Sequence, residues 1–225
     1  LNQLKDDAFS TQRLQRSAQA RMHRAAILAK SGRGDEAAGE YETAIEELNA
    51  AWQSSDPDDF YRRHLADAER DLGTLLLENP SRHDAAEVYL ERSLQTYLEL
   101  MRQQPSVSLL RKTTQANCLL GRLNTTPSER VAALERATVG FEMLRDHDVL
   151  SESESLQWIE SLVELGELAA AQGADVSRIA DQIHQWRSQE NPVTLQAEVQ
   201  QRIEVLLDTV SDSNSDGSDQ SSTSR

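Results

Sequence analysis

The chain has 225 residues, of which 38% are hydrophobic and only 4% are aromatic. Its 38 acidic residues outnumber its 23 lysines and arginines, so the formal net charge is −15 at pH 7. Sequence-independent nucleic-acid binding depends on an excess of basic residues, and we therefore expect no nucleic-acid partner. So few aromatic residues favour a thin array of helices with a core of alanine and leucine over one large core.

The single cysteine, Cys118, cannot form an internal disulfide. This favours a reducing compartment, and we expect a cytoplasmic protein. No apolar run approaches the roughly 20 residues that a membrane span requires, so no span is expected. The chain begins with Leu1 rather than methionine and enters a helical pattern at once, which indicates a fragment of a longer protein.

Helical patterns begin near the N-terminus and continue along the chain. Apolar residues recur at three- and four-residue steps over residues 3–30, which predicts one long helix. Gly32 and Gly34 are expected to end it, and Asp35 is expected to open the second helix. The next three helices are predicted at 57–78, 83–103 and 105–123, with a proline near the start of the first and the third.

Two capping-box patterns mark the starts of the sixth and seventh helices. Thr126 stands three residues before Glu129, and Ser151 stands three residues before Glu154. In each pair the hydroxyl and the carboxylate can satisfy each other's backbone N–H groups at a helix N-terminus. Pro127 is then expected in the first turn of the sixth helix.

The C-terminal part is predicted to hold an eighth helix at 176–188 and a ninth that starts at Asn191-Pro192. We expect the ninth helix to cap the open end of the stack, whose apolar face would otherwise meet water. Residues 211–225 are rich in serine and aspartate and can bury too little apolar surface to fold, so a disordered tail is expected. The expected organisation is one helical repeat domain over residues 1–210, followed by this tail.

A leucine–glycine pair recurs along the chain, with its glycine at Gly73, Gly121 and Gly166, at steps of 48 and 45 residues. A fixed period in this range is typical of stacked repeat proteins. Glycine in a helix interior costs roughly 1 kcal/mol against alanine, so its recurrence indicates close packing of helices. Small or apolar residues follow at matched distances. They are Ala37, Tyr41 and Ala44, then Ala86, Leu90 and Ser93, then Ala133, Ala137 and Gly140.

This series resembles the tetratricopeptide repeat family, whose first helix carries a Leu-Gly pair and whose second carries alanine, an aromatic residue or leucine, and alanine. The resemblance covers roughly residues 12–188. It departs from the family in period, which is usually 34 residues, and in lacking the motif tryptophan. It implies an all-α solenoid of about four antiparallel helix hairpins. Long repeats of this type look like the C-terminal arrays of some bacterial serine/threonine protein kinases, although this chain carries none of the kinase motifs.

In that family the first helices of the hairpins line a concave groove that holds peptides. The resemblance therefore implies, by position, a groove in which Arg70 and Arg122 are the only cations, which favours an acidic or mixed peptide. The implied partner-binding residues are Arg70, Thr74, Gln115, Arg122 and Glu167, beside Met22, Ala26, Asp67, Leu77, Cys118 and Glu160.

Together these patterns predict a non-enzymatic protein-interaction or scaffold module within a larger protein, with a serine/threonine protein kinase as the parent that the resemblance implies. The alternative is a regulatory domain that senses a small molecule bound in the repeat groove. The five histidines show no metal-ligand spacing, and no nucleophile–base or paired-carboxylate set is recognisable. We therefore expect no catalytic residue, no metal and no cofactor.

Overall fold

The structure is a computed structural model of the chain, and it describes all residues except 1, 55–58, 124–125, 189–194 and 217–225, together with the side chains of 2–10, 54 and 210–216. The described residues form helices, with no strand among them. Their contacts divide the chain into two compact units, which we name unit 1 (residues 1–124) and unit 2 (residues 125–225). The boundary falls within the third of the expected hairpins.

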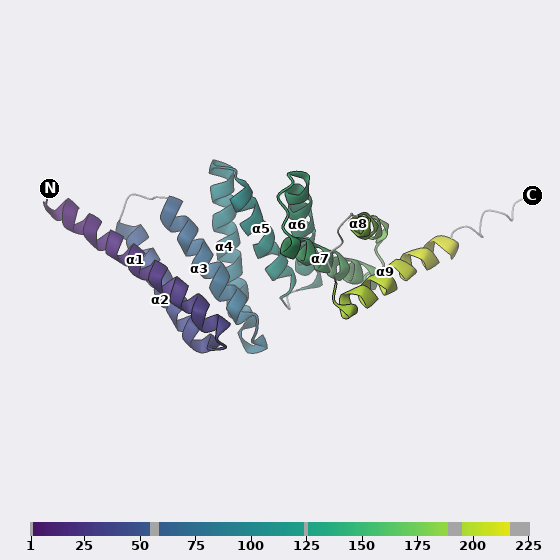
Figure 1. The fold of residues 1–225 in the computed structure, drawn as a ribbon, viewed down its shortest axis with the longest axis horizontal. Helices are drawn as coiled ribbons and strands as arrows, with labels where there is room; N and C mark the ends of the chain where they lie inside the picture. Colours follow the sequence, from purple (N-terminus) through teal and green to yellow (C-terminus); the bar gives the residue numbers. More distant parts are fainter. Residues whose placement is uncertain (1, 55–58, 124–125, 189–194, 217–225) are drawn as a thin grey trace, which may run out of the picture. The chain divides into compact units, whose positions relative to one another are not determined.

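Unit 1 is a row of helices in which each packs against the next in sequence (Figure 1). The strongest contacts join α1 to α2 and α3 to α4, so neighbouring helices form pairs. The elements are α1 (Asn2–Lys30), α2 (Gly34–Ser54), α3 (Asp59–Leu76), the 3-10 helix η1 (Pro80–Arg82), α4 (His83–Gln103) and α5 (Val107–Gly121).

The turn between α1 and α2 depends on a glycine. Gly32 has a φ of 73°, in the left-handed region that side chains disfavour. The N–H of Arg33 donates to the carbonyl of Leu28 at 3.0 Å, which closes the last turn of α1. Helix α2 then starts with Asp35 and Glu36 in its first turn, where carboxylates interact favourably with the helix dipole. The predicted stop and restart are confirmed to within one residue.

The core of unit 1 is built from small residues and leucines. A Cβ added to Gly73 would lie 2.7 Å from Cγ of Leu90 and 3.2 Å from the carbonyl oxygen of Ala86. The glycine of α3 and the alanine and leucine of α4 therefore meet, as the repeat pattern predicts. Ten alanines of the described part of unit 1 are buried, which lets helix backbones approach closely. They are Ala18, Ala25, Ala37, Ala38, Ala44, Ala51, Ala66, Ala68, Ala86 and Ala116.

Unit 2 is arranged around α7, which contacts each of the other helices of this unit. Large side chains fill its core, among them Phe141, Trp158 and Trp186. The indole N–H of Trp186 donates to the hydroxyl of Ser155 at 2.9 Å and so ties α8 to α7. The elements are α6 (Pro127–Asp146), α7 (Glu152–Ala171), α8 (Ser177–Arg187) and α9 (Ala197–Asp216).

Both predicted capping boxes are present. The N–H of Glu129 donates to Oγ1 of Thr126 at 3.4 Å, and the N–H of Thr126 donates to the carboxylate of Glu129 at 3.3 Å. The N–H of Glu154 donates to Oγ of Ser151 at 3.3 Å, and the N–H of Ser151 donates to the carboxylate of Glu154 at 2.9 Å. Each box satisfies two backbone donors that the first helical turn leaves unpaired.

Two helix ends differ from the prediction. Helix α3 ends at Leu76 rather than at Glu78, because the chain turns into η1, where the side chain of Asn79 accepts the N–H of Ser81 at 3.1 Å. Helix α5 begins at Val107 rather than at Pro105, because the hydroxyl of Ser106 caps it by accepting the N–H of Leu109 at 3.2 Å.

The last helix also differs from the prediction. Helix α9 begins at Ala197, so Leu195 precedes it; the expected start, Asn191-Pro192, lies outside the described residues. An acidic residue, Glu198, stands in its first turn, which suits a helix N-terminus. The helix continues to Asp216, beyond the expected domain end at 210, and most of the expected tail lies outside the described residues. It packs on α7 and α8 and buries Ile203.

Candidate functional site

Polar side chains of unit 1 meet in a band that crosses α1, α3, α4 and α5. We name this band the polar belt and define it as Gln19, His64, Asp67, Tyr97 and Lys112. Nε2 of Gln19 lies 3.3 Å from Nε2 of His64, which links α1 to α3. Nζ of Lys112 donates to both carboxylate oxygens of Asp67 at 2.6 and 2.7 Å. The hydroxyl of Tyr97 donates to Asp67 at 2.6 Å, so this one carboxylate ties α3 to α4 and α5.

The links of the belt join residues at a nearly constant separation in the sequence. Gln19 and His64 are 45 residues apart, and so are Asp67 and Lys112. Tyr61 and Gln15, joined by a hydrogen bond of 3.4 Å next to the belt, are 46 residues apart. These separations are two or three residues shorter than the 48-residue step from Gly73 to Gly121, so each link joins residues that are slightly offset from the matched positions of the sequence pattern.

The charges of the belt are partly shielded from water. The side chains of Asp67 and Lys112 are 18% and 25% exposed, so their attraction is screened less than that of a surface pair. Burial lowers the pKa of His64, although the nearby Asp67 opposes the shift, and the ring is therefore neutral at pH 7. Burial raises the pKa of Tyr97, so its hydroxyl keeps the proton that it donates to Asp67.

The belt has the groups needed to recognise a polypeptide. Its amide and its neutral imidazole each offer both a donor and an acceptor. Gln19 and His64 are half-buried and come from different helices, so their polar atoms are held in place and still reach solvent. Among the described residues there is no group of three or more His, Cys, Asp or Glu side chains that could hold a metal ion.

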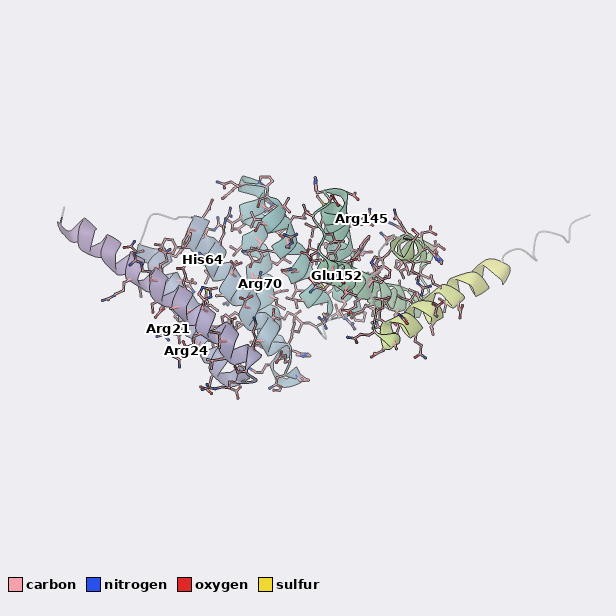
Figure 2. All side chains as sticks on the ribbon, in the orientation of Figure 1. Arg21, Arg24, His64, Arg70, Arg145 and Glu152 are labelled. Atoms are coloured by element: carbon pink, nitrogen blue, oxygen red, sulfur yellow. The ribbon has the colours of Figure 1, made fainter. Side chains whose placement is uncertain are left out.

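Two of the groove residues implied by the resemblance lie beside the belt on α3. Arg70, labelled in Figure 2, forms an ion pair of 2.6 Å with its neighbour Asp71. Thr74 is exposed one turn further on, and its hydroxyl donates to the carbonyl of Arg70 at 2.8 Å. The guanidinium of Arg70 is therefore already neutralised within the chain.

The other three implied residues are more scattered. Gln115 is half-buried on α5, one turn after Lys112, and Arg122 is exposed at the C-terminal end of the same helix. Arg122 forms no ion pair in the part of the chain that the structure describes. Glu167 belongs to unit 2, where its carboxylate accepts two hydrogen bonds from Arg202 at 2.6 and 2.8 Å. Unit 1 thus holds four of the five residues.

Sequence reasoning missed Gln19, His64 and Lys112 as site residues. A signal for them was present, because shifting the sequence by 45 residues places His64 on Gln19 and Lys112 on Asp67. The leucine–glycine pairs gave a step of 48 residues from Gly73 to Gly121 and of 45 residues only from Gly121 to Gly166, beyond the belt. His64 was considered only as a metal ligand.

A second polar cluster joins α1 to α2. Arg21 donates to Glu40 at 2.9 Å and to Glu47 at 3.1 Å, and Arg24 lies 3.2 Å from Glu40. Figure 2 shows both arginines on α1. The basic first helix and the acidic second helix thus attract each other, which stabilises their pairing and leaves these charges less available to a partner.

The helices of unit 2 enclose a hollow of about 470 Å³ between α6, the C-terminal part of α7 and α8. We name it the α6–α8 trough. Half of its twelve lining residues are aliphatic, among them the buried Leu165 and Ile179, and the other half are polar or charged.

Comparisons of the chain with protein-family models, with curated proteins and with solved structures gave no match. In the described ranges, no helix has the length and apolar character that crossing a membrane would require.

Proposed function

We propose that the chain is a non-catalytic protein-interaction module, in which unit 1 binds an extended peptide segment of a partner across the polar belt. The observation that carries the proposal is the series of side-chain contacts, 45 residues apart in the sequence, that joins α1 to α3 and α3 to α5. The resemblance to the tetratricopeptide family supports the same face, because Arg70, Thr74 and Gln115 lie on α3 and α5. It also supports a tetratricopeptide-like solenoid within a larger cytoplasmic protein, with a kinase as the implied parent.

Peptide binding at this belt has a physical basis. An extended peptide brings unpaired backbone N–H and C=O groups, which need donors and acceptors when they leave water. The hydrogen bonds at Asp67 hold the side chains of Tyr97 and Lys112 in place before binding. A preorganised surface loses less side-chain entropy when it binds. Arg122, the exposed cation at the end of α5, would attract an acidic residue of the partner.

A peptide library selected against the full chain tests this proposal. For each selected peptide, the dissociation constant is measured by fluorescence anisotropy with the unmodified chain, with Arg122→Glu and with Arg102→Glu. The two arginines are matched, because both are exposed at the C-terminal end of a helix and affect the helix dipole equally, but Arg102 lies on α4. We expect Arg122→Glu to weaken binding about tenfold and Arg102→Glu to change it less than twofold, since charged hydrogen bonds contribute about 1.5–3 kcal/mol.

A second variant, Gln115→Ala, tests the face without a change of charge. It should weaken the same peptides, with far-UV circular dichroism unchanged. Peptides that bind equally well to all three variants, or whose binding protects only unit 2 from hydrogen exchange, would contradict the proposal.

A further inference from the structure

The α6–α8 trough of unit 2 is a site of a different kind from the polar belt. It lies between one face of α6 and one face of α8, with the C-terminal part of α7 beneath them. Leu165, Ala169 and Ile179 form an aliphatic floor, and Val139 on α6 remains 48% exposed beside it. At one end the side-chain amide of Gln182 on α8 donates to the carboxylate of Glu142 on α6 and bridges the two walls.

The rim carries opposite charges that do not neutralise each other. Glu135 of α6 and Arg178 of α8 both line the trough and are exposed. Neither forms an ion pair within the described residues, with the other or with a third group. A second carboxylate, Asp175, accepts the N–H of Ser177 at 2.9 Å. Hydrogen bonding with the Ser177 side chain, and then with its backbone N–H, lowers the pKa of Asp175, so this carboxylate is charged at pH 7.

The size of the trough limits what it can hold. Its wall on α6 runs from Val131 to Val139, which is about 12 Å at a rise of about 1.5 Å per residue. A volume of about 470 Å³ lies within the range of small-ligand sites, roughly 300–1,000 Å³. A length of about 12 Å matches only about two turns of a partner helix, which is short for a helix-docking groove. The dimensions suit a small molecule.

We propose that the α6–α8 trough binds a small zwitterion with an aliphatic body, the chemical class of a free aliphatic amino acid. Arg178 would pair with the carboxylate of the ligand, because guanidinium and carboxylate form two parallel hydrogen bonds. Glu135 would pair with the ammonium group, and Asp175 adds a second negative charge to the lining of the trough. The aliphatic side chain would lie on Leu165 and Ile179. This inference concerns unit 2 and does not depend on the peptide binding proposed for unit 1.

The test titrates L-leucine into the full chain, labelled with ¹⁵N and methyl ¹³C, and follows the NMR signals. Isothermal titration calorimetry gives the dissociation constants. We expect saturable shifts at the methyl groups of Val139, Leu165 and Ile179. Leucinamide lacks the carboxylate, N-acetyl-leucine lacks the ammonium and glycine lacks the aliphatic body, so each should bind at least tenfold more weakly, as expected for the loss of a charged hydrogen bond or of a buried side chain.

Variants of the charged residues test which side chain binds which charged group of the ligand. Arg178→Gln should weaken leucine binding at least tenfold, whereas Arg102→Gln, which removes an exposed positive charge in unit 1, should leave it unchanged. Glu135→Gln provides an independent variant on α6, and it should weaken leucine but not N-acetyl-leucine.

Three results would overturn the proposal. They are an absence of saturable shifts with leucine, equal binding of leucine and N-acetyl-leucine, and equal affinity of Arg178→Gln and Arg102→Gln. An amphipathic peptide that shifts the trough methyl groups when leucine does not would also overturn it, and would assign the trough to a protein partner.

Discussion

Gly73, in a leucine–glycine pair of unit 1, lies against the neighbouring helix of its own helix pair, whereas Gly166, in the leucine–glycine pair of unit 2, lies against the last helix. A Cβ at Gly73 would meet Leu90 and the backbone of Ala86 on α4. A Cβ at Gly166 would lie 2.5 Å from Cδ2 of Leu206, on α9. The same local sequence therefore serves two packing arrangements, and a repeated motif shows that a close approach occurs without showing which helix approaches.

The cores of the two units also differ in the size of the side chains that fill them. Against the ten buried alanines of unit 1, the described part of unit 2 buries three, at Ala133, Ala137 and Ala180, and it uses Trp158 and Trp186 instead. Small residues let helix axes come close, and bulky side chains hold them apart. A space such as the trough between α6 and α8 is the expected consequence of the second kind of core.

The largest effect should come from overfilling the close contact of unit 1. In Gly73→Leu the new side chain meets the branch point of Leu90 and a backbone carbonyl, neither of which can move without shifting α4. We expect unit 1 to lose about 3 kcal/mol of unfolding free energy, at the upper end of typical overpacking costs. Hydrogen exchange of α3 and α4, followed by mass spectrometry in urea, would localise the loss.

Gly39→Leu is the matched control for this change. Gly39 is exposed on α2, and a Cβ there would have no neighbour within 4 Å. Because leucine is the better helix former, this variant should gain up to about 1 kcal/mol. Equal losses at both positions would mean that the contact with Leu90 does not limit the packing of unit 1.

The next effect concerns a buried carboxyl group in each unit. Glu154 of unit 2 is 4% exposed, and its carboxylate accepts the hydroxyl of Ser151 at 2.6 Å and a backbone N–H at 2.9 Å. Glu69 of unit 1 is 6% exposed, and burial raises the pKa of Glu69 to about 7, an effect that the charge of Arg92 opposes. Compensation of the buried charge is thus weaker in unit 1.

Glu69 should make unit 1 less stable as the pH rises. An unfolded glutamate has a pKa of about 4.3, so between about pH 4.5 and pH 7 the folded state binds more protons than the unfolded state. Stability is therefore highest below this window and falls as the pH rises through 7. We expect the advantage of Glu69→Gln over the unmodified chain to grow by about 2.5 kcal/mol between pH 5 and pH 8, given about 1.4 kcal/mol per pKa unit, because pH 5 already lies near the lower end of this window.

Urea unfolding at pH 5 and at pH 8, followed by hydrogen exchange of α3, provides the measurement. Glu91→Gln is the control, since Glu91 is exposed on α4 and its replacement changes only a surface charge. If Glu69→Gln and Glu91→Gln show the same dependence on pH, the buried carboxyl group is not its source.

The features that the sequence predicts well are those with short-range signals. Each capping box occupies four residues and satisfies its own N–H groups, so Thr126 and Ser151 were identified without knowledge of the fold. The close approach of helices at Gly73 was predicted from the recurring glycine, and its partner Leu90 stands on the adjacent helix after a short connection.

The features that the sequence predicts poorly depend on how helices cross. The contact of Gly166 with Leu206 joins α7 to α9 and passes over α8, and the trough between α6 and α8 depends on the combined bulk of side chains from three helices. Such packing angles depend on the volumes of many side chains from several helices, which no local sequence pattern specifies. The belt lies between these cases. The two residues of each of its pairs are 45 residues apart in the sequence, but the contact of Asp67 with Lys112 depends on how α3 and α5 pack.

We expect the smallest effect from Gly166→Ala, which is also the most direct test of the difference between Gly73 and Gly166. The three atoms nearest to its new Cβ all belong to the Leu206 side chain, with the two methyl carbons at 2.5 and 3.0 Å. These methyl groups can turn away, and alanine recovers up to about 1 kcal/mol of helix propensity, so the net change should stay within about 0.5 kcal/mol. Gly73→Ala should cost more, because a carbonyl oxygen of the backbone lies in its way.

A double-mutant cycle with Leu206→Ala separates the two contributions to the Gly166→Ala effect. If Leu206 is the obstacle, removing its side chain leaves only the helix-propensity gain, and Gly166→Ala should then stabilise unit 2 by about 0.5–1 kcal/mol. The loss of tryptophan fluorescence on urea unfolding is a suitable signal, because unit 2 contains two of the three tryptophans, Trp158 and Trp186. An unchanged cost of Gly166→Ala in the Leu206→Ala background would show that α9 is not what the glycine accommodates, and the contrast between the two glycines would then be lost.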